Sequence, residues 1–287
     1  MDEATYLAVV PPRYRPFREL GRGRSGIVYA ARDLLSGDVV AVKITPTEIA
    51  TAALARRLLT PCAGCVRIRA VSTDRGALAV IVMDRVEGEP FVRALRGEPA
   101  LDTRPLLFGQ PLSDAGQSVF APLSAPGVAR TREALRSVAR ALVALHERAL
   151  VHGDIQPDNV LLRDEDATLV DIDGVAEGEI YRPILATATY MSPEQARQEL
   201  RYASDAYGLG VMAFEALTGA VPFSGSAEEV LVKKETVRAA RPSFLVQGIP
   251  GDLDEAVEGL LERSPARRLG PRELLRLLRP RRADDGL

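Results

Sequence analysis

The chain has 287 residues, of which 46% are hydrophobic, enough to build the core of one domain with two lobes or of two small domains. Its 37 Lys and Arg nearly balance its 39 Asp and Glu, so the formal net charge is −2. This charge gives no long-range attraction to nucleic acid or to an anionic membrane. No segment approaches the roughly 20 apolar residues of a membrane span, and the N-terminus lacks the pattern of a signal peptide. We therefore expect a cytoplasmic protein.

The first third of the chain has the pattern of a small β-rich region. Residues 1–13 end in two prolines, and we expect them to form a loose arm. From residue 14 to 83, short segments rich in Val and Ile predict a mostly antiparallel sheet. A stretch rich in Ala, Leu and Arg, residues 48–59, predicts one helix within it. The expected strands are 27–30, 38–44, 66–71 and 78–83.

Two cysteines, Cys62 and Cys65, form a CAGC motif after the expected helix. Only His146 and His152 could complete a four-ligand zinc site, and the βαβ pattern that surrounds a thioredoxin-type motif is missing. We interpret the cysteines as small residues in a loop, with a redox switch as the alternative.

Helices are expected through the rest of the chain, after an interruption. Residues 97–128 contain frequent Pro, Ser and Gly and have neither helical nor strand periodicity, which predicts a disordered surface loop. Packing of its apolar residues, or docking of a partner on them, is the alternative. Apolar residues then recur at helical spacing over residues 131–150. Further helices are expected at 205–218, 227–238, 252–262 and 271–279.

An acidic motif lies at the end of the first long helix. Residues 152–159 read HGDIQPDN, and the carboxylates of Asp171 and Asp173 follow a short apolar run. A single Asp in a loop is most often a cap or turn residue. An Asp that orients a hydroxyl, together with an Asn and a later Asp for Mg²⁺, is the acidic half of a phosphoryl-transfer site.

A basic motif near the N-terminus supplies the other half. Residues 20–29 read LGRGRSGIVY, and the next expected strand contains VAVK, residues 40–43. The glycines let the backbone turn sharply and approach a triphosphate, and Lys43 offers a point charge to its oxygens. A GxGxxG string alone also fits a hairpin turn, so the argument depends on the order of all these motifs.

Over residues 14–279 the chain resembles the bacterial eukaryotic-like (Hanks-type) Ser/Thr protein kinases. TATYMSPEQAR, residues 187–197, is similar to the end of the family's activation segment, and residues 204–223 are similar to its central helix. Arg268 matches the Arg that pairs with the Glu of that segment, here Glu194.

The resemblance implies an α+β, bilobal protein-kinase-like fold. Residues 14–83 would form a small antiparallel β lobe with one helix, 84–88 the hinge, and 89–279 a mainly α-helical lobe that carries the insertion 97–128. Residues 280–287 would be a C-terminal tail. In this family ATP binds between the two lobes.

The resemblance also implies which residues contact ATP. The backbone of Asp84 and Val86 would meet the adenine edge, Met83 would lie at the back of the pocket, and Lys43 would contact the α and β phosphates. The full set of implied nucleotide contacts is Leu20, Gly21, Gly23, Ser25, Gly26, Val28, Ala41, Lys43, Met83, Asp84, Val86 and Leu161.

In the acidic half, the resemblance assigns Asp154 to the acceptor hydroxyl, Asn159 to one Mg²⁺, and Asp171 to the metal that bridges the β and γ phosphates. Thr187 matches a Thr that contacts the catalytic Asp. We therefore expect it to be structural rather than a site of phosphorylation.

Two departures from the family pattern lie beside the catalytic Asp. The usual Arg before it is replaced by Gly153. The resulting HGD motif, residues 152–154, also occurs in aminoglycoside and choline phosphotransferases. The usual Lys two residues after it is Gln156, which can donate a hydrogen bond to the γ phosphate but has no charge. Charge-assisted hydrogen bonds are about twice as strong as neutral ones, so we expect a lower rate.

Two further departures leave alternatives open. The family's DFG is DID here: we assign Asp171 as its first residue because Leu169 then points into the core, with Asp173 as the alternative, and both can serve one metal. The family spacing places the Glu partner of Lys43 at Thr51. The only carboxylate in that helix is Glu48, about one turn earlier, so either Glu48 forms the pair or the pair is missing.

The sequence therefore predicts a non-specific serine/threonine protein kinase, which uses ATP and Mg²⁺ to phosphorylate protein hydroxyls. Its expected partners are ATP, protein substrates and a regulatory protein, with no nucleic acid and no membrane. A pseudokinase is the first alternative, given Gly153, Gln156 and Asp173. A small-molecule phosphotransferase of the aminoglycoside or choline kinase type is the second, and Glu194 with Arg268 argues against it.

Overall fold

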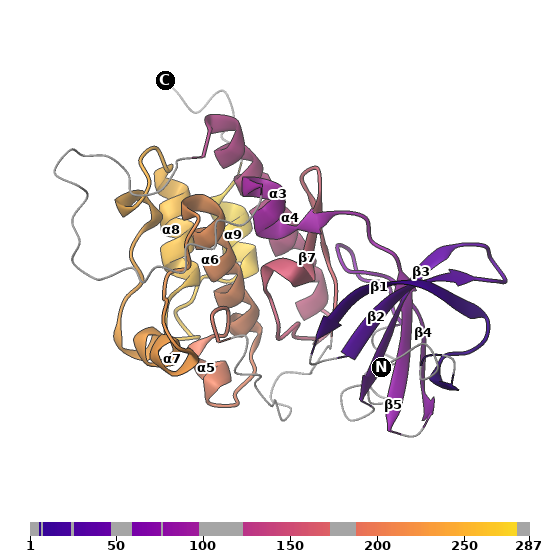
Figure 1. Ribbon diagram of the computed structural model, residues 1–287. Helices are drawn as coiled ribbons and strands as arrows, with labels where there is room; N and C mark the ends of the chain where they lie inside the picture. The colour runs from indigo at the N-terminus through magenta and orange to yellow at the C-terminus, as the bar shows by residue number, and fades with distance from the viewer. Residues whose placement is uncertain are drawn as a thin grey trace. The chain divides into compact units, whose positions relative to one another are not determined.

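The structure is a computed structural model that describes residues 6, 8–23, 26–46, 59–75, 77–97, 123–172 and 188–279. The chain divides into two compact units, Met1–Glu87 and Gly88–Leu287 (Figure 1). The first unit is built on β-strands and the second mainly on helices, so the α+β fold with two lobes that the sequence predicted is confirmed.

The first unit contains a five-stranded antiparallel sheet in the order β1-β2-β3-β5-β4. The strands are β1 (Tyr14–Gly23), β2 (Gly26–Asp33), β3 (Val39–Pro46), β4 (Ile68–Arg75) and β5 (Leu78–Asp84). The four expected strands are confirmed with ends shifted by a few residues. Strand β1 was not predicted, because its mixture of charged residues, Pro and Gly hides the alternation that marks a strand.

The chain's own N-terminal residues cover one face of this sheet. Tyr6 and Val10 are 1% and 3% exposed and pack on apolar side chains of β2, β3 and β5. The Tyr6 ring meets Tyr29 edge to face with 4.9 Å between centroids, and its hydroxyl donates to the carbonyl of Tyr14 (3.3 Å). The expectation of a loose arm over residues 1–13 is therefore wrong at Tyr6 and Val10. The apolar face that attracts them is assembled from distant strands, so no local pattern reveals it.

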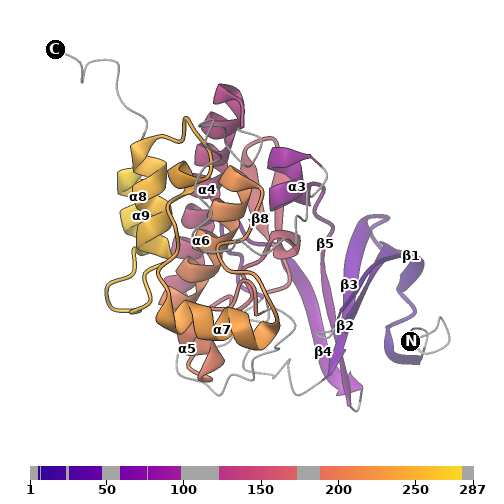
Figure 2. The ribbon, with the colours of Figure 1, turned by 60° about the vertical axis from the view of Figure 1, so that its left-hand side comes forward.

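The second unit packs around a buried central helix. Helix α6 (Tyr202–Thr218) is buried on every side from Ser204 onward and contacts α3, α4 and α8 (Figure 2). Most of its residues are apolar, which suits a core position, and its buried carboxylates Asp205 and Glu215 are the exceptions. The other helices are α3 (Phe91–Arg96), α4 (Ala125–His146), α5 (Pro193–Ala196), α7 (Ala227–Thr236), α8 (Gly251–Leu260) and α9 (Pro271–Leu277).

A small sheet of three strands, β6-β7-β8, completes the second unit. Its strands are β6 (Glu89–Pro90), β7 (Val160–Arg163) and β8 (Asp166–Leu169), and a 3₁₀ turn, η1 (Pro157–Asn159), precedes β7. The expected helices are confirmed as α4, α6, α7, α8 and α9. The sequence did not predict this sheet, α3 or α5, because elements of two to six residues are too short to show a period.

The C-terminal boundary expected for the insertion is wrong by four residues, since α4 already begins at Ala125. The Ser124 hydroxyl caps the helix by accepting from the Gly127 N–H (3.2 Å), and a proline occupies the first turn. Ser and Pro are common at helix starts, but they are also common in loops, so the sequence pattern predicted a loop at these positions. Residues 98–122 of the insertion and the expected helix 48–58 lie outside the described part of the chain. None of the helices in the described part is long and apolar enough to cross a membrane.

Candidate active site

Hydrogen bonds connect the loop His152–Asn159 to the central helix α6. The Asp205 carboxylate accepts from the backbone N–H of His152 (2.9 Å) and of Gly153 (2.8 Å), and from His146 Nε2 (2.8 Å). Gly153 has φ of 81°, in the left-handed region where glycine carries no steric cost. The glycine that replaces the family's Arg therefore suits the backbone conformation of the loop.

Asp154 lies at the centre of a set of amide donors. The Nδ2 of Asn159 donates to the carbonyl oxygen (2.9 Å) and to Oδ2 (2.8 Å) of Asp154. The Nε2 of Gln156 donates to the same Oδ2 (2.8 Å). Gln156 and Asn159 thus fix the rotamer of Asp154 and place two donors on one of its carboxylate oxygens.

The strand-end residue Val170 connects this loop to Asp171. The buried ring of His152 donates from Nε2 to the Val170 carbonyl (3.0 Å), and its Nδ1 accepts from the Asp154 N–H (3.4 Å). The Val170 N–H donates to the Asn159 carbonyl (2.9 Å). Both backbone polar groups of Val170 are therefore hydrogen-bonded to the loop His152–Asn159. Leu169 is fully buried, as the assignment of Asp171 required.

The residues around Asn159 and Asp171 suit a Mg²⁺ ion that is bound together with phosphates. Because the amide nitrogen of Asn159 donates to Asp154, its amide oxygen is the atom available to a metal. Mg²⁺ prefers oxygen ligands and is usually held by one or two protein groups plus substrate phosphates and water. No cluster of three His, Cys, Asp or Glu suited to a metal occurs among the described residues. An amide oxygen and one carboxylate fit the nucleotide-bound type of site.

In the first unit, Lys43 lies on the face of the sheet opposite to the N-terminal residues. It is 2% exposed on β3, with Val28 of β2 directly across from it. Ala41 lies two residues earlier on the same strand and is opposite Met83 of β5. Since cross-strand partners point to the same face, the sheet gathers Val28, Ala41, Lys43 and Met83 on one surface.

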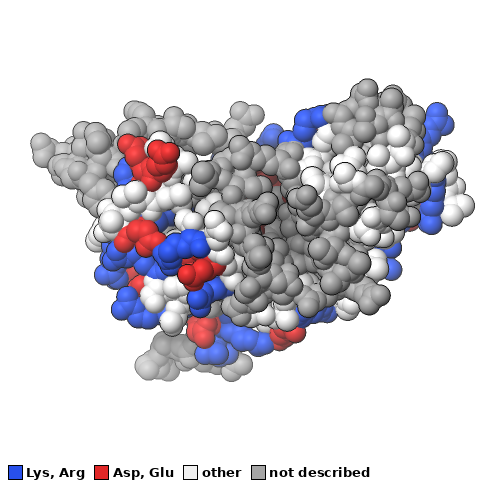
Figure 3. Space-filling model, turned by 90° about the horizontal axis from the view of Figure 1, so that it is seen from below, with Lys and Arg blue, Asp and Glu red and all other residues white. Residues whose placement is uncertain are grey.

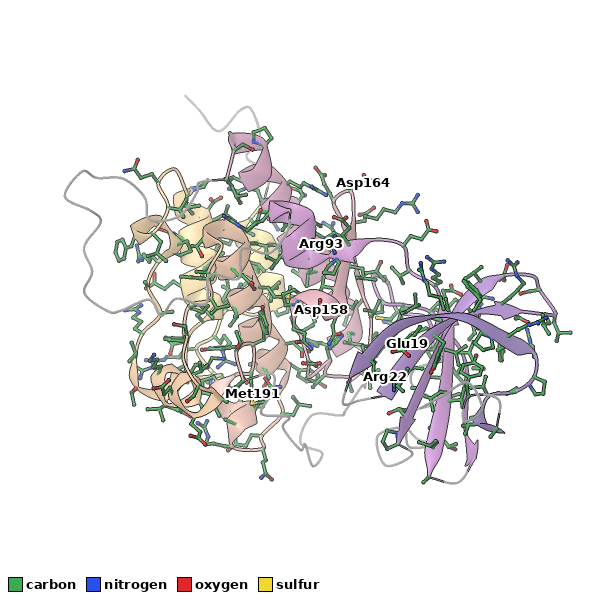
Figure 4. All side chains as sticks on the ribbon, in the orientation of Figure 1. Glu19, Arg22, Arg93, Asp158, Asp164 and Met191 are labelled. Carbon is green, nitrogen blue, oxygen red and sulfur yellow. The ribbon has the colours of Figure 1, made fainter. Side chains whose placement is uncertain are left out.

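The glycines of the β1-β2 hairpin differ in how much space the neighbouring atoms leave for a side chain. A Cβ on Gly26 would lie 2.0 Å from the Ile44 carbonyl oxygen, so the packing of β2 on β3 already requires glycine there. A Cβ on Gly21 would meet no atom within 4 Å, so among the described atoms nothing requires glycine at this position. Gly23 pairs with Gly26 at the hairpin end, and a Glu19–Arg22 ion pair (2.7 Å) lies alongside on β1 (Figure 4).

The remaining residues implied as nucleotide contacts lie in both units. Leu20 is 40% exposed on β1, and Leu161 is half-buried on β7. Asp84 ends β5, and its N–H donates to the Arg67 carbonyl (2.9 Å). Val86 is half-buried in the segment after β5. Glu48, Ser25, Asp173 and Thr187 lie outside the described residues.

Residues 188–191 form a shelf beside Asp154. The Tyr190 hydroxyl donates to Glu215 of α6 (2.6 Å), and the side chain of Gln195 donates to the Gly153 carbonyl (2.8 Å). One small hollow is lined by Asp154 together with Tyr190, Met191 and Gln195. Residues of the shelf and of the loop that carries Asp154 therefore line a common hollow within the second unit.

The predicted pair of Glu194 and Arg268 is confirmed. Two hydrogen bonds of 2.5 and 2.9 Å join the groups, and both side chains are fully buried. Burial raises the pKa of Glu194, but the hydrogen bonds and charge of Arg268 outweigh it, so the net pKa is lower than usual. The Ser204 hydroxyl donates to the same carboxylate (2.9 Å), which connects the pair to α6.

Sequence reasoning missed four residues that position this site: Asp205, Gln195, Glu215 and Lys234. Asp205, Glu215 and Gln195 were available as signals, because they lie in segments that resemble the family, residues 204–223 and 187–197. Lys234 acts through contacts with a distant segment, and no local pattern marks it.

The described surface of the second unit mixes both signs of charge. On the face in Figure 3, blue and red side chains alternate over the helical unit. Ion pairs occur on the described surface of this unit, such as Arg197 with Glu235 and Arg241 with Glu258 (2.6 Å). Exposed pairs of this kind contribute little stability, about 0–1 kcal/mol each.

The sequence was compared with those of known proteins. Residues 14–277 match the model of the protein kinase domain. The chain is 32% identical to the serine/threonine-protein kinase AfsK of Streptomyces coelicolor over 94% of its length, which is 32% of AfsK. It is 28% identical to PknA of Mycobacterium tuberculosis over 89% of its length, which is 58% of PknA. It is 39% identical to PknL of the same organism over 47% of its length, which is 36% of PknL.

The matched part of the chain thus spans between about a third and three fifths of these relatives. The likeness to AfsK and PknA runs through both units, and the relatives are serine/threonine protein kinases of bacteria. The chain belongs to the protein kinase family, with bacterial serine/threonine protein kinases as its relatives.

Proposed function

We propose that the protein is a serine/threonine protein kinase that transfers the γ-phosphoryl group of ATP to hydroxyl groups of other proteins. The observation that carries the proposal is the environment of Asp154. Its carboxylate is oriented by two amide side chains, and Asp154 is one of the residues that line the same small hollow as Tyr190 and Met191 of the shelf. A carboxylate in this position can orient an acceptor hydroxyl and take its proton.

In the proposed reaction the hydroxyl oxygen of the acceptor attacks the γ phosphorus, and the bond from that phosphorus to the bridging oxygen of ADP breaks. The hydroxyl proton passes to Asp154 and then to solvent. A bound Mg²⁺ neutralises charge that develops on the phosphates, and Asn159 and Asp171 would hold it. Asp173 is the alternative or additional carboxylate.

For the nucleotide, we propose that Lys43 binds the α and β phosphates and that Gly21 lets the backbone come close to them. Ala41, Val28 and Met83 share the Lys43 face and offer apolar surface to the adenine ring. Glu48 remains our proposed partner for Lys43. The other nucleotide contacts implied by the resemblance belong to the same proposal, as does ATP with Mg²⁺ as the cofactor pair.

A protein acceptor is favoured over a small molecule by the buried Glu194–Arg268 pair. It fixes the start of α5, the helix that follows the shelf, and Gln195 of the same helix donates to the Gly153 carbonyl, so α5 is bonded to the loop that carries Asp154. An enzyme for small acceptors has no need of a braced peptide shelf. The names of the relatives, all serine/threonine protein kinases, support the same choice.

The test is to incubate the protein with Mg²⁺ and ATP labelled on the γ phosphate. One reaction contains a mixture of unstructured proteins rich in Ser and Thr, and parallel reactions contain choline or an aminoglycoside. We expect label on serine or threonine of protein. Label on the small acceptors alone would replace the proposal by the phosphotransferase alternative, and ATP binding without any transfer would replace it by the pseudokinase.

A further inference from the structure

A buried lysine, Lys234, connects helix α7 to the shelf of residues 188–191. It lies in the last turn of α7 and is fully buried. Its Nζ donates to the carbonyls of Ala188 (2.7 Å), Thr189 (2.7 Å) and Met191 (2.6 Å). The shelf comes shortly before α5, and α5 and α7 lie side by side in both ribbon views.

The geometry matches the ammonium form of this side chain. An ammonium group has three N–H donors, and three backbone carbonyls meet it, whereas a neutral amine has only two. The ring of Tyr207, from α6, lies 5.3 Å from the Nζ and adds a cation–π contact. Burial lowers the pKa of Lys234 to about 7, which measures how costly the buried charge is. The carbonyls and the ring oppose that cost.

The shelf has little regular structure of its own that could satisfy these carbonyls. Residues 188–190 form a turn, and Met191 lies between this turn and α5 (Figure 4). Buried carbonyls need partners, and here one side chain supplies partners for three of them. Removal of that side chain would leave the backbone of the shelf without the donors that define its shape.

We propose that Lys234 is a positioning residue for the protein substrate, which holds the shelf in its working shape and makes α7 and the shelf move as one body. This inference rests on the proposed kinase activity, because the shelf is the surface offered to a protein acceptor. It also explains how the shelf is ordered in a chain where Gly153 provides no guanidinium for a phosphorylated loop residue. Lys234 delivers a positive charge to the backbone itself, from the side of α7.

The neighbouring Lys233 provides a matched control. Its Nζ donates to the Ser224 carbonyl (2.6 Å), outside the shelf, on the same helix. Lys233→Met and Lys234→Met remove the same group from adjacent positions. Only the second is expected to affect the shelf.

The experiment measures steady-state kinetics with a serine or threonine peptide and with ATP, at a temperature well below the melting of each variant. Loss of even one charge-assisted hydrogen bond corresponds to about tenfold in an equilibrium constant, so Lys234→Met should raise the KM for peptide by at least about tenfold. The KM for ATP should stay within about twofold of wild type. Lys233→Met should change neither. If Lys234→Met does not fold, Lys234→Gln, which retains two N–H donors, takes its place. Its KM for peptide should rise by a smaller factor, and its KM for ATP should again stay near that of wild type.

Hydrogen exchange gives a readout that does not depend on activity. In Lys234→Met the backbone amides of residues 188–191 should exchange at least about tenfold faster, while those of α6 stay protected. Unchanged peptide KM and unchanged exchange in a folded variant would overturn the inference, and so would uniform loss of protection and of all kinetic constants. If wild type transfers no phosphate, the proposed function fails, and the exchange comparison alone decides whether Lys234 holds the shelf.

Discussion

Replacement of Asp205 by Asn should loosen the catalytic loop from the central helix. The Asp205 carboxylate accepts from two backbone N–H groups and from His146 Nε2, all within 2.9 Å, and is 1% exposed. Asn offers one oxygen and one NH₂ group, so a donor must face a donor on at least one side. Hydrogen bonds to charged groups are worth about 1.5–3 kcal/mol each. Loss of one or two of them predicts a decrease of about 2–5 kcal/mol in the free energy of unfolding.

Urea unfolding followed by far-UV circular dichroism measures this decrease, because the chain has no Trp and its helices lie mainly in the second unit. The control is Glu147→Gln, which removes a carboxylate that pairs with Arg272 where both groups are more than half exposed. A pair near the surface should cost about 0–1 kcal/mol. Asp205→Asn should also lower phosphoryl transfer, since small misplacements of catalytic groups cost about 10²-fold in rate. A decrease of less than about 0.5 kcal/mol for Asp205→Asn would refute the reasoning.

Three other outcomes follow from the same structure. Lys43→Met should weaken ATP binding and transfer together, and equal stabilisation of the variant and wild type by ATP in a thermal-shift assay would contradict its role. The net pKa of Glu194 is below its usual value, so the stability it contributes is present above about pH 4.3 and is lost as the pH falls through the folded pKa. The melting temperature of Glu194→Gln should therefore fall less steeply than that of wild type as the pH drops from 5 to 3, and parallel curves would count against the pair. Because Gly153 offers no charge to a phosphorylated segment, phosphatase treatment should leave activity nearly unchanged, whereas a reversible loss mapped to residues 173–192 would exclude this view.

Much of the fold could be predicted because it depends on local patterns. Helix α4 shows its buried stripe at helical spacing, and strands β2, β3 and β5 are rich in Val and Ile. The catalytic loop could also be found, since Asp154 and Asn159 come from one continuous motif. In both cases the residues that determine the structure are close together in the sequence.

The rest depends on contacts between segments far apart in the chain. Tyr6 packs on strands that follow it by 20 residues or more, and Lys234 donates to carbonyls more than 40 residues earlier. A lysine in a helix is normally a solvent-exposed residue, and nothing beside Lys234 in the sequence indicates that three carbonyls surround it. Such residues become visible only when the chain is folded.

The central claim is that Asp154 acts on the acceptor hydroxyl. The most direct test is to measure phosphoryl transfer and ATP affinity of the Asp154→Asn variant side by side. The carboxylate acts on the acceptor hydroxyl, so the variant should bind ATP and Mg²⁺ nearly as well as wild type while label on protein serine and threonine disappears. Asp158→Asn is the control, because Asp158 is exposed on the same loop and should keep both properties (Figure 4). Wild-type transfer by Asp154→Asn would contradict the account.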